Sequence, residues 1–391
     1  MTISWPPTTA DLLPDDHERA VLVGRVMRAE GPSVVTVRDG RLVDITARVA
    51  TIRDLAEQTD PAEFVRGCPG ADIGSVSEIL ARTPPEFRRP GTPRLLSPID
   101  LQPVKAAGVT FAVSLAERVI EERCGGDASL ADRFREQIAE RVGTDLSALR
   151  PGSAETARLK EALVAEGWWS QYLEVGLGPD AEIFTKSAPM GSVGTAVDIG
   201  IHPRSTWNNP EPEVVLLVSA SARIVGACLG NDVNLRDFEG RSALLLTAAK
   251  DNNASAAVGP FIRLFDDSFD LDTVRKLTVT LRVQGTDRFA LRAESSMAEI
   301  SRDPEELIRQ LMGRHHQYPD GVVLFLGTMF APVADRAEPG QGFTHHIDDL
   351  VSISTPTLGS LVNRVRTSDD CEPWEFGTAD LFRSLAARGL L

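Results

Sequence analysis

The sequence lacks the features that mark disulfide-stabilised, zinc-binding and membrane-spanning chains. Its 391 residues include only four cysteines, Cys68, Cys124, Cys228 and Cys371, at spacings of 56, 104 and 143 residues. These spacings fit no disulfide framework or zinc motif, so we expect reduced, buried thiols. No apolar run approaches the roughly 18 residues that span a bilayer, and the N-terminal segment has no signal-peptide pattern. We therefore expect a soluble, cytoplasmic protein.

Basic residues are also scarce. Lys and Arg number 41 against 56 Asp and Glu, which gives a net charge of −15. Such a surface repels phosphate backbones and anionic lipids, so nucleic acid and membranes are poor partners. An anionic small substrate remains compatible, because local charge in a cleft can oppose the overall sign. The hydrophobic content of 42% and charged content of 25% are typical of a globular protein.

Two regions with different sequence patterns indicate two domains. Ala20–Ile45 reads as short strands, with Asp39-Gly40 as a hairpin turn. Residues 83–98 contain five prolines and one glycine, which is typical of a linker. We predict a small N-terminal domain over residues 1–97, ending in this linker, and a larger domain over residues 98–391.

After the linker, helices and strands mix without a regular strand–helix–strand repeat. Helical patterns cover Asp132–Val142 and Glu155–Ala165, and Asp303 followed by Pro304 marks a helix start. Strand patterns cover five segments: Val214–Val218, Ile224–Leu229, Leu277–Gln284, Val322–Leu326 and Leu350–Ser354. These features predict an α+β fold with a mixed or antiparallel sheet, and they argue against a Rossmann fold.

Three carboxylates lie beside the first two of these strands. Glu211 and Glu213 flank Pro212 at a strand start, where side chains two residues apart share a face. Asp232 follows Ile224–Leu229, which would reach the glutamates if the two strands formed a hairpin. Adjacent carboxylates repel unless a cation or proton lies between them, and a site of hard oxygen ligands suits Mg²⁺. The alternative is that Glu211 and Glu213 are exposed charges on an edge strand.

The surrounding motifs resemble the fumarylacetoacetate hydrolase superfamily. They are, in order, EPE before a strand, GNDVNLRDFEG, a lysine followed by Gly259-Pro260, LGTMFAP and HHIDDLVSISTPTLGSLVNRV. The resemblance covers roughly residues 98–391 and is greatest for the dehydratase branch that acts in oxidative pentose catabolism. Many hydrolases of the superfamily carry a catalytic histidine early in this domain, but Val109–Arg123 has none. This departure favours dehydration over C–C bond hydrolysis.

The resemblance implies a mixed β-roll catalytic domain that binds Mg²⁺, with Mn²⁺ or Ca²⁺ as substitutes. The implied metal ligands are Glu211, Glu213 and Asp232, and the implied acid/base residues are Lys250 and Glu182. The implied substrate contacts are Arg236, Thr328, Ser114 and Arg118. The superfamily also implies a homodimer or homotetramer.

The implied reaction is loss of water from 2-keto-3-deoxy-D-xylonate to give 2-oxoglutarate semialdehyde. Lys250 would remove a proton from carbon 3 as a neutral amine, which requires its pKa to fall from about 10.4 toward 7–8. Glu182, protonated because burial raises its pKa, would protonate the hydroxyl leaving carbon 4. The rival functions are an acylpyruvate-type C–C hydrolase and a non-catalytic sugar-acid binding protein.

Several residues also have plainer interpretations from the sequence alone. Lys250 is a cation at the end of an apolar helical run, Glu182 lies on a strand that could face solvent, and Lys186 is a weaker candidate base. Arg236 would share a helix face with Asp232 and could form a local ion pair with it. The histidine pairs are interpreted as loop or surface residues, because adjacent strand residues face opposite ways; they are His315, His316, His345 and His346.

Overall fold

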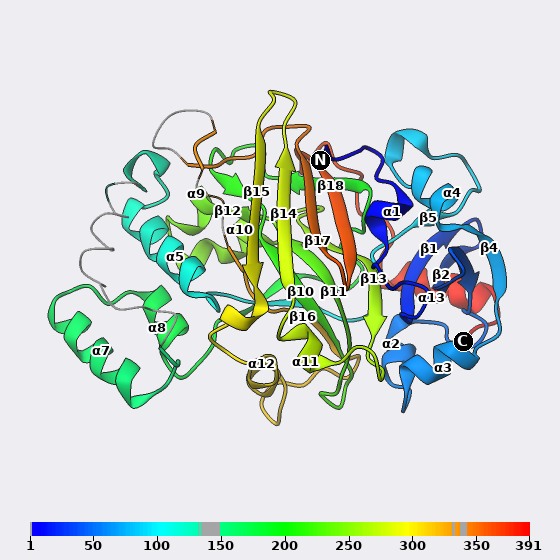
Figure 1. Ribbon diagram of the computed structural model, residues 1–391, viewed down its shortest axis with the longest axis horizontal. Helices are drawn as coiled ribbons and strands as arrows, with labels where there is room; N and C mark the ends of the chain where they lie inside the picture. The colour runs from blue at the N-terminus through cyan, green and yellow to red at the C-terminus, as the bar shows by residue number, and fades with distance from the viewer. Residues whose placement is uncertain (1, 132, 134–148, 331, 333, 337–341) are drawn as a thin grey trace.

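The computed structural model describes the chain except for residues 1, 132, 134–148, 331, 333 and 337–341 (Figure 1). Its largest element is an 11-stranded sheet in the order β4-β3-β2-β1-β13-β11-β10-β16-β6-β7, with β5 paired to β1. The strands of this sheet are β1 (Leu22–Arg28), β2 (Gly31–Arg38), β3 (Arg41–Asp44), β4 (Ala71–Ser75), β5 (Arg94–Leu95), β6 (Val104–Ala107), β7 (Ile183–Ser187), β10 (Pro212–Val218), β11 (Ile224–Asp232), β13 (Ala256–Leu264) and β16 (Val322–Phe325).

A second sheet of five strands has the order β15-β14-β17-β18-β8, and β9 pairs with β12. These strands are β8 (Val197–Ile201), β9 (Asn208–Asn209), β12 (Asn234–Leu235), β14 (Thr278–Gln284), β15 (Ala290–Ser296), β17 (Leu350–Thr355) and β18 (Gly359–Thr367). Parallel and antiparallel pairs both occur, since β16 runs parallel to β6 and β18 parallel to β8, whereas β10 and β11 are antiparallel. The five predicted strands are therefore present, and the predicted α+β class is confirmed.

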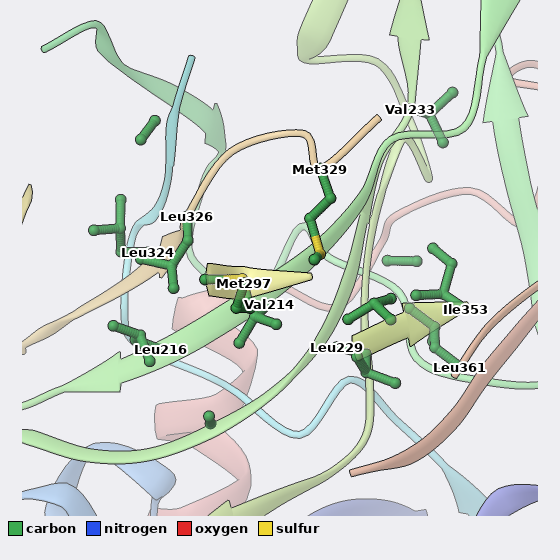
Figure 2. Close-up of a cluster of buried hydrophobic side chains, with 14 of the residues drawn as sticks. Val214, Leu216, Leu229, Val233, Met297, Leu324, Leu326, Met329, Ile353 and Leu361 are labelled. Atoms are coloured by element: carbon green, nitrogen blue, oxygen red, sulfur yellow. The ribbon is translucent and has the colours of Figure 1, made fainter. Parts of the chain in front are cut away.

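The two sheets pack face to face, which explains the uninterrupted apolar run of β10. Every residue of β10 is buried. Val214 and Leu216 contribute to the core between the sheets, which also contains Leu229 of β11 and Ile353 of β17 (Figure 2). Val215 and Leu217 point to the other face, into a second core. A strand buried on both faces gains nothing from alternating polarity, so its sequence is continuously hydrophobic.

Helices gather at the two ends of the sheets (Figure 1). α5, α7 and α8 lie at one end, and α2, α3, α4 and α13 lie at the other. The helices are α1 (Thr9–Leu12), α2 (Ile52–Ala56), α3 (Pro61–Gly67), α4 (Val76–Ala81), α5 (Ala112–Cys124), α7 (Ala154–Ala165), α8 (Gln171–Leu177), α9 (Arg236–Glu239), α10 (Leu246–Lys250), α11 (Leu271–Val274), α12 (Pro304–Leu311) and α13 (Thr378–Ala387). The predicted helix Glu155–Ala165 is α7, and Asp303 caps α12 by accepting the Glu305 N–H. The predicted helix Asp132–Val142 lies almost wholly outside the described residues.

The N-terminal strands continue the large sheet rather than forming a sheet of their own. β1 pairs with β13, and the predicted turn at Asp39-Gly40 joins β2 to β3, with both residues at positive φ. The core on the outer face of the sheet contains side chains from both sides of the predicted boundary at residue 97. Within the proline-rich segment, Arg94–Leu95 pairs with β1. The division into two domains stays a prediction, whereas the sheet and the core extend across it.

All four cysteines are buried and free, as expected from their spacing. Among the described residues, no helix combines the length and the apolar character needed to cross a bilayer.

Candidate functional site

The β10–β11 hairpin brings the three predicted metal ligands together. Pro212 pairs with Asn231, and the Asp232 N–H donates to the Glu211 carbonyl at 3.0 Å. One carboxylate oxygen from each of Glu211, Glu213 and Asp232 lies within 4.8 Å of the others. These side chains are only 2%, 1% and 1% exposed. The alternative that Glu211 and Glu213 are exposed edge-strand charges is therefore wrong.

The chemistry of this donor set fits a divalent cation. Glu213 accepts the Gly327 N–H at 2.7 Å and the Thr328 hydroxyl at 3.3 Å. Burial and the charges of Asp232 and Glu211 raise the pKa of Glu213 well above its usual value. Three buried carboxylates with this mutual repulsion need positive charge, and oxygen ligands are those that Mg²⁺ prefers. The residues present therefore fit the predicted magnesium site.

Lys250 and Lys186 both reach the acids, but in different ways. The Lys250 ammonium, at the end of α10, donates to Glu211 at 2.5 Å and to Asp232 at 3.1 Å. The Lys186 ammonium lies 2.8 Å from the other oxygen of Asp232 and also donates to two backbone carbonyls, those of Val233 at 2.9 Å and Lys250 at 2.5 Å. These hydrogen bonds hold β7 against the backbone at Val233 and Lys250. The two hydrogen bonds of the Lys250 ammonium, in contrast, both go to carboxylates.

The groups around Lys250 act on its pKa in opposite directions. Burial does favour the neutral amine, but the charges of Asp232, Glu211 and Glu239 outweigh it and raise the pKa of Lys250. Burial lowers the pKa of Lys186, against the opposing effect of Asp232. The sequence could not show how many carboxylates would surround each amine. Lys250 is the last residue of α10, as the helical run in the sequence predicted, and its side chain is buried.

Glu182 enters the same region from the start of β7. Glu182, Phe184 and Lys186 alternate along the chain, so their side chains share one face, and the Lys250 ammonium lies 5.6 Å from the Phe184 ring centre. Burial raises the pKa of Glu182, although Arg118 and Lys250 oppose the shift. Gly108 makes room for this carboxyl, because a Cβ there would lie 1.9 Å from the Glu182 Oε2. Glu182 is half-buried, and its charge interacts with those of Glu211 and Asp232 as well.

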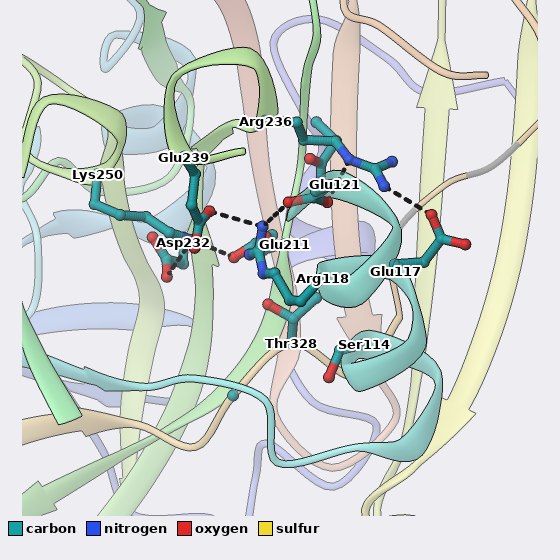
Figure 3. Close-up of polar contacts among 12 residues, drawn as sticks. Ser114, Glu117, Arg118, Glu121, Glu211, Asp232, Arg236, Glu239, Lys250 and Thr328 are labelled. Carbon is teal, nitrogen blue, oxygen red and sulfur yellow. Dashed lines mark hydrogen bonds and ion pairs between the residues drawn. The ribbon is translucent and has the colours of Figure 1, made fainter. Parts of the chain in front are cut away.

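Arg118 of α5 is the central cation of the cluster (Figure 3). Its guanidinium contacts Glu211 at 2.5 Å, and Glu121 and Glu239 each at 2.7 Å. Burial acts to raise the pKa of Glu211, but the charges of Arg118 and Lys250 outweigh it and lower this pKa. Burial raises the pKa of Glu239 to about 7, against the opposing charge of Arg118. Arg118 was predicted as a substrate contact, and the structure places it against a proposed metal ligand instead.

Arg236 lies behind Arg118 and does not pair with Asp232 as the helix spacing suggested. Its guanidinium contacts Glu117 at 2.7 Å and Glu121 at 2.6 Å, and lies 4.3 Å from the Trp207 ring centre. The expected local ion pair is wrong because the residues on either side of Val233 continue an extended chain, and α9 begins only at Arg236. Glu117, Glu121 and Glu239 were not predicted, and their acidic side chains on α5 and α9 were the only signal in the sequence.

The remaining predicted residues are placed as follows. Thr328 lies against Glu213, through the hydroxyl contact given above. Ser114 lies one helical turn before Arg118, and its hydroxyl donates to the Phe111 carbonyl at 2.8 Å. His315 and His316 are exposed, as predicted. The surface interpretation is wrong for His345, which is 5% exposed and contacts Asp349 at 3.3 Å.

The cluster as a whole holds more carboxylates than cations. Four cationic side chains face seven carboxylates, so the ionised cluster carries an excess of three negative charges. The cations are Arg118, Lys186, Arg236 and Lys250, and the carboxylates are Glu117, Glu121, Glu182, Glu211, Glu213, Asp232 and Glu239. A bound dication would offset most of this excess, which is a second reason why the site suits one.

Comparison with known proteins agrees with this geometry. Residues 212–366 match the family model described as fumarylacetoacetate (FAA) hydrolase C-terminal. The chain is 29% identical over 185 residues to 2-dehydro-3-deoxy-D-arabinonate dehydratase of Saccharolobus solfataricus, a match that covers 47% of this chain and 58% of that protein. It is 25% identical over 268 residues to a probable 2-keto-3-deoxyxylonate dehydratase of Haloferax volcanii, covering 68% and 87% of the two chains.

Solved structures show the same fold. The apo form of 2-keto-3-deoxy-D-arabinonate dehydratase superposes with a TM-score of 0.61 at 20% identity, over 89% of this chain and 99% of that one. The same enzyme in complex with magnesium and 2,5-dioxopentanoate gives a TM-score of 0.60, with equal identity and coverage. At this identity the likeness establishes the fold, and it confirms the predicted roll with its mixed sheets.

Proposed function

We propose, from the premise that residues 212–366 belong to the fumarylacetoacetate hydrolase C-terminal family, that this protein is a metal-dependent dehydratase of 2-keto-3-deoxy sugar acids. The specific reaction is removal of water from 2-keto-3-deoxy-D-xylonate to give 2-oxoglutarate semialdehyde, with Mg²⁺ as cofactor. Two relatives whose names describe dehydratases of such acids support this choice. The observation that carries it is the buried set of Glu211, Glu213 and Asp232 with Lys250 and Glu182 beside it.

Glu211, Glu213 and Asp232 would hold the metal. When bound, the dication would polarise the 2-keto oxygen of the substrate and offset the negative charge that keeps Lys250 protonated. The protein supplies the rest of the arrangement. Arg118 fixes the Glu211 carboxylate from the side opposite Lys250, because each binds a different oxygen of that carboxylate. Thr328 and the Gly327 N–H orient Glu213 in the same way.

The two acid/base residues have distinct tasks in this proposal. Lys250, as a neutral amine, removes the proton from carbon 3, and Glu182 donates a proton to the hydroxyl that leaves carbon 4. A raised pKa suits Glu182 for donation, since a larger fraction of the carboxyl is protonated at neutral pH. The reaction removes one water from the acid and leaves a double bond between carbons 3 and 4. One hydrogen of carbon 5 and the hydrogen of its hydroxyl then move to carbons 3 and 4 by tautomerisation, which gives the aldehyde at carbon 5. Each residue of this kind contributes about 10²–10⁴-fold to the rate.

The test supplies the purified protein with 2-keto-3-deoxy-pentonate and, separately, with an acylpyruvate, in Mg²⁺ and in EDTA. We expect semialdehyde from the pentonate only, and only with the metal. Release of pyruvate from the acylpyruvate would favour the C–C hydrolase, and binding without turnover of either compound would favour the sugar-acid binding protein. Glu182→Gln should retain substrate binding while lowering kcat, and unchanged turnover would remove Glu182 from the mechanism.

A further inference from the structure

Beyond the acids, β9 and β12 form a separate two-stranded antiparallel sheet whose register matches that of the β10–β11 hairpin. The Asp232 N–H donates to the Glu211 carbonyl, and the next paired residues along the two segments are Asn209 and Asn234. The residue counts on the two sides are equal, so no bulge separates these positions. Side chains two residues apart in an extended chain share a face. Asn209 is therefore expected on the face of Glu211, and Asn234 on the face of Asp232.

Contacts at both ends of this run verify that assignment. On one side of the asparagine pair, Glu211 and Asp232 both reach the Lys250 ammonium, so they share a face. On the other side, the Asp237 N–H donates to the Trp207 carbonyl at 3.2 Å, and the neighbouring Arg236 stacks on the Trp207 ring at 4.3 Å. The asparagine pair lies between these two cross-strand pairs.

The amides of this middle pair are buried but poorly satisfied. Asn209 and Asn234 are both 0% exposed. Asn209 donates to the Pro210 carbonyl at 2.9 Å, while its Oδ1 has no hydrogen-bond partner among the described residues. Neither Oδ1 nor Nδ2 of Asn234 has a partner there. An unpaired buried polar atom costs roughly 1–3 kcal/mol, so a ligand that supplied hydrogen bonds to these three atoms would gain that free energy.

Their neighbours on this face have the same property. Trp207 Nε1 and Arg236 Nη1 are also buried without a hydrogen-bond partner. These four residues hold five of the fourteen such atoms in the described part of the chain. Both donors and acceptors are present, which matches a ligand hydroxyl, because a hydroxyl donates and accepts at once. A second carboxylate would find only repulsion from the nearby acids.

We propose that Asn209 and Asn234 bind the terminal hydroxyl of the substrate and so select its chain length. This inference rests on the proposed function, in which the 2-keto acid end lies at Glu211 and Asp232. The asparagine pair is two residues further along the hairpin, which is about 7 Å. A five-carbon acid spans about 5 Å between its end carbons, from C–C bonds of about 1.5 Å. Its hydroxyl at carbon 5 therefore reaches the amides while the keto acid stays at the carboxylates.

The experiment compares two acids that differ only in this hydroxyl-bearing carbon. They are 2-keto-3-deoxy-pentonate and 4-hydroxy-2-ketobutyrate, which retains the keto acid and the leaving hydroxyl. With Mg²⁺ present, we expect the wild-type protein to favour the pentonate in kcat/KM. In Asn234→Leu we expect this preference to fall by about 10–100-fold, because leucine has the same branched arrangement of side-chain heavy atoms as asparagine and cannot pair with a hydroxyl. Asn209→Leu should give the same change in preference.

Stability separates substrate binding from a structural role. Asn234→Leu removes two unpartnered atoms, so we expect a Tm equal to or above that of the wild type. Asn208→Leu is the matched control on the opposite face. The Asn208 amide is satisfied, since it donates to Ser205 at 3.1 Å and accepts the His345 N–H at 3.2 Å. This control should lower Tm and leave the preference between the two acids unchanged.

Each outcome decides the question. An unchanged preference in Asn234→Leu and Asn209→Leu, with an active wild type, would overturn the hydroxyl site and leave the dehydratase proposal standing. A large loss of Tm in Asn234→Leu would also overturn it, since the amide would then have a structural partner. A wild-type protein that dehydrates neither acid with Mg²⁺ would overturn the proposed function and this inference together.

Discussion

The packing of Glu182 against Gly108 gives a direct test of the proposed acid. Gly108 follows β6, and its N–H donates to the Glu182 carbonyl at 3.0 Å. In Gly108→Ala the new Cβ would lie 1.9 Å from Glu182 Oε2, whereas ordinary contact begins near 3.4 Å. The Glu182 carboxyl must therefore move by about 1.5 Å. Gly108 is not at a positive φ, so the backbone itself accepts alanine.

A displacement of this size is large for a group that transfers a proton. Misplacement by 1 Å can cost about 10²-fold in rate, so we expect kcat for semialdehyde formation to fall by about that factor in Gly108→Ala. The free energy of unfolding should change by no more than about 1 kcal/mol, because the Glu182 side chain can move aside. Initial rates measured with saturating Mg²⁺, together with urea denaturation, test both expectations.

Two controls separate the effect on Glu182 from a general effect of the substitution. Gly313→Ala places a methyl group where nothing lies within 4 Å, and it should leave kcat unchanged. In the Glu182→Gln background, Gly108→Ala should cause little further loss, because the displaced group no longer acts as an acid. Wild-type kcat in Gly108→Ala would refute the reasoning, as would full additivity of the two substitutions.

Three further predictions concern metal binding, stability and pH. Glu213→Gln should abolish the rise in Tm that Mg²⁺ causes. Without metal, this variant should melt at or above the wild-type temperature, because a buried like charge is gone. A rise in Tm with Mg²⁺ as large as that of the wild type would contradict the site. Arg118→Met should cost about 3–5 kcal/mol in urea denaturation, since it leaves three buried carboxylates without their shared cation, and a loss under 1 kcal/mol would contradict this. Burial lowers the pKa of His345, against the opposing effect of Asp349. As the pH falls, the unfolded chain therefore takes up a proton on this histidine before the folded protein does. The free energy of unfolding should thus decrease below about pH 6.5, by at most about 1.4 kcal/mol per pH unit. His345→Gln should reduce that dependence in denaturation curves at pH 7 and pH 5, and identical slopes would show that another group is responsible.

Local sequence patterns predicted the parts of the site that one hairpin positions. The apolar runs of β10 and β11, separated by a short turn, bring Asp232 to Glu211 and Glu213 without help from the rest of the chain. The same patterns predicted the turn at Asp39-Gly40 and the cap at Asp303. In each case the interacting residues are close in sequence, so periodicity and turn chemistry contain the information.

The rest depends on residues that are far apart in the chain. Arg118 reaches Glu211 across 93 positions, and no periodicity within α5 shows which side of the helix will meet the hairpin. The sequence could not show that the pKa of Lys250 is raised by carboxylates, because all three of them are brought to it by tertiary packing. His345 looked like a surface residue because its burial depends on Asp349 and Phe343 around it. The predicted homo-oligomer stays a prediction.

The pairing of β1 with β13 makes the first hundred residues an integral part of the catalytic scaffold. A chain beginning at residue 98 would leave β13 as an unpaired edge and would uncover the apolar face beneath α2 and α3. Open strand edges of this kind recruit other chains and lead to aggregation. Since β13 also borders β11, which carries Asp232, fraying would begin one strand away from the acid cluster. Truncation should therefore yield an insoluble protein rather than a smaller enzyme.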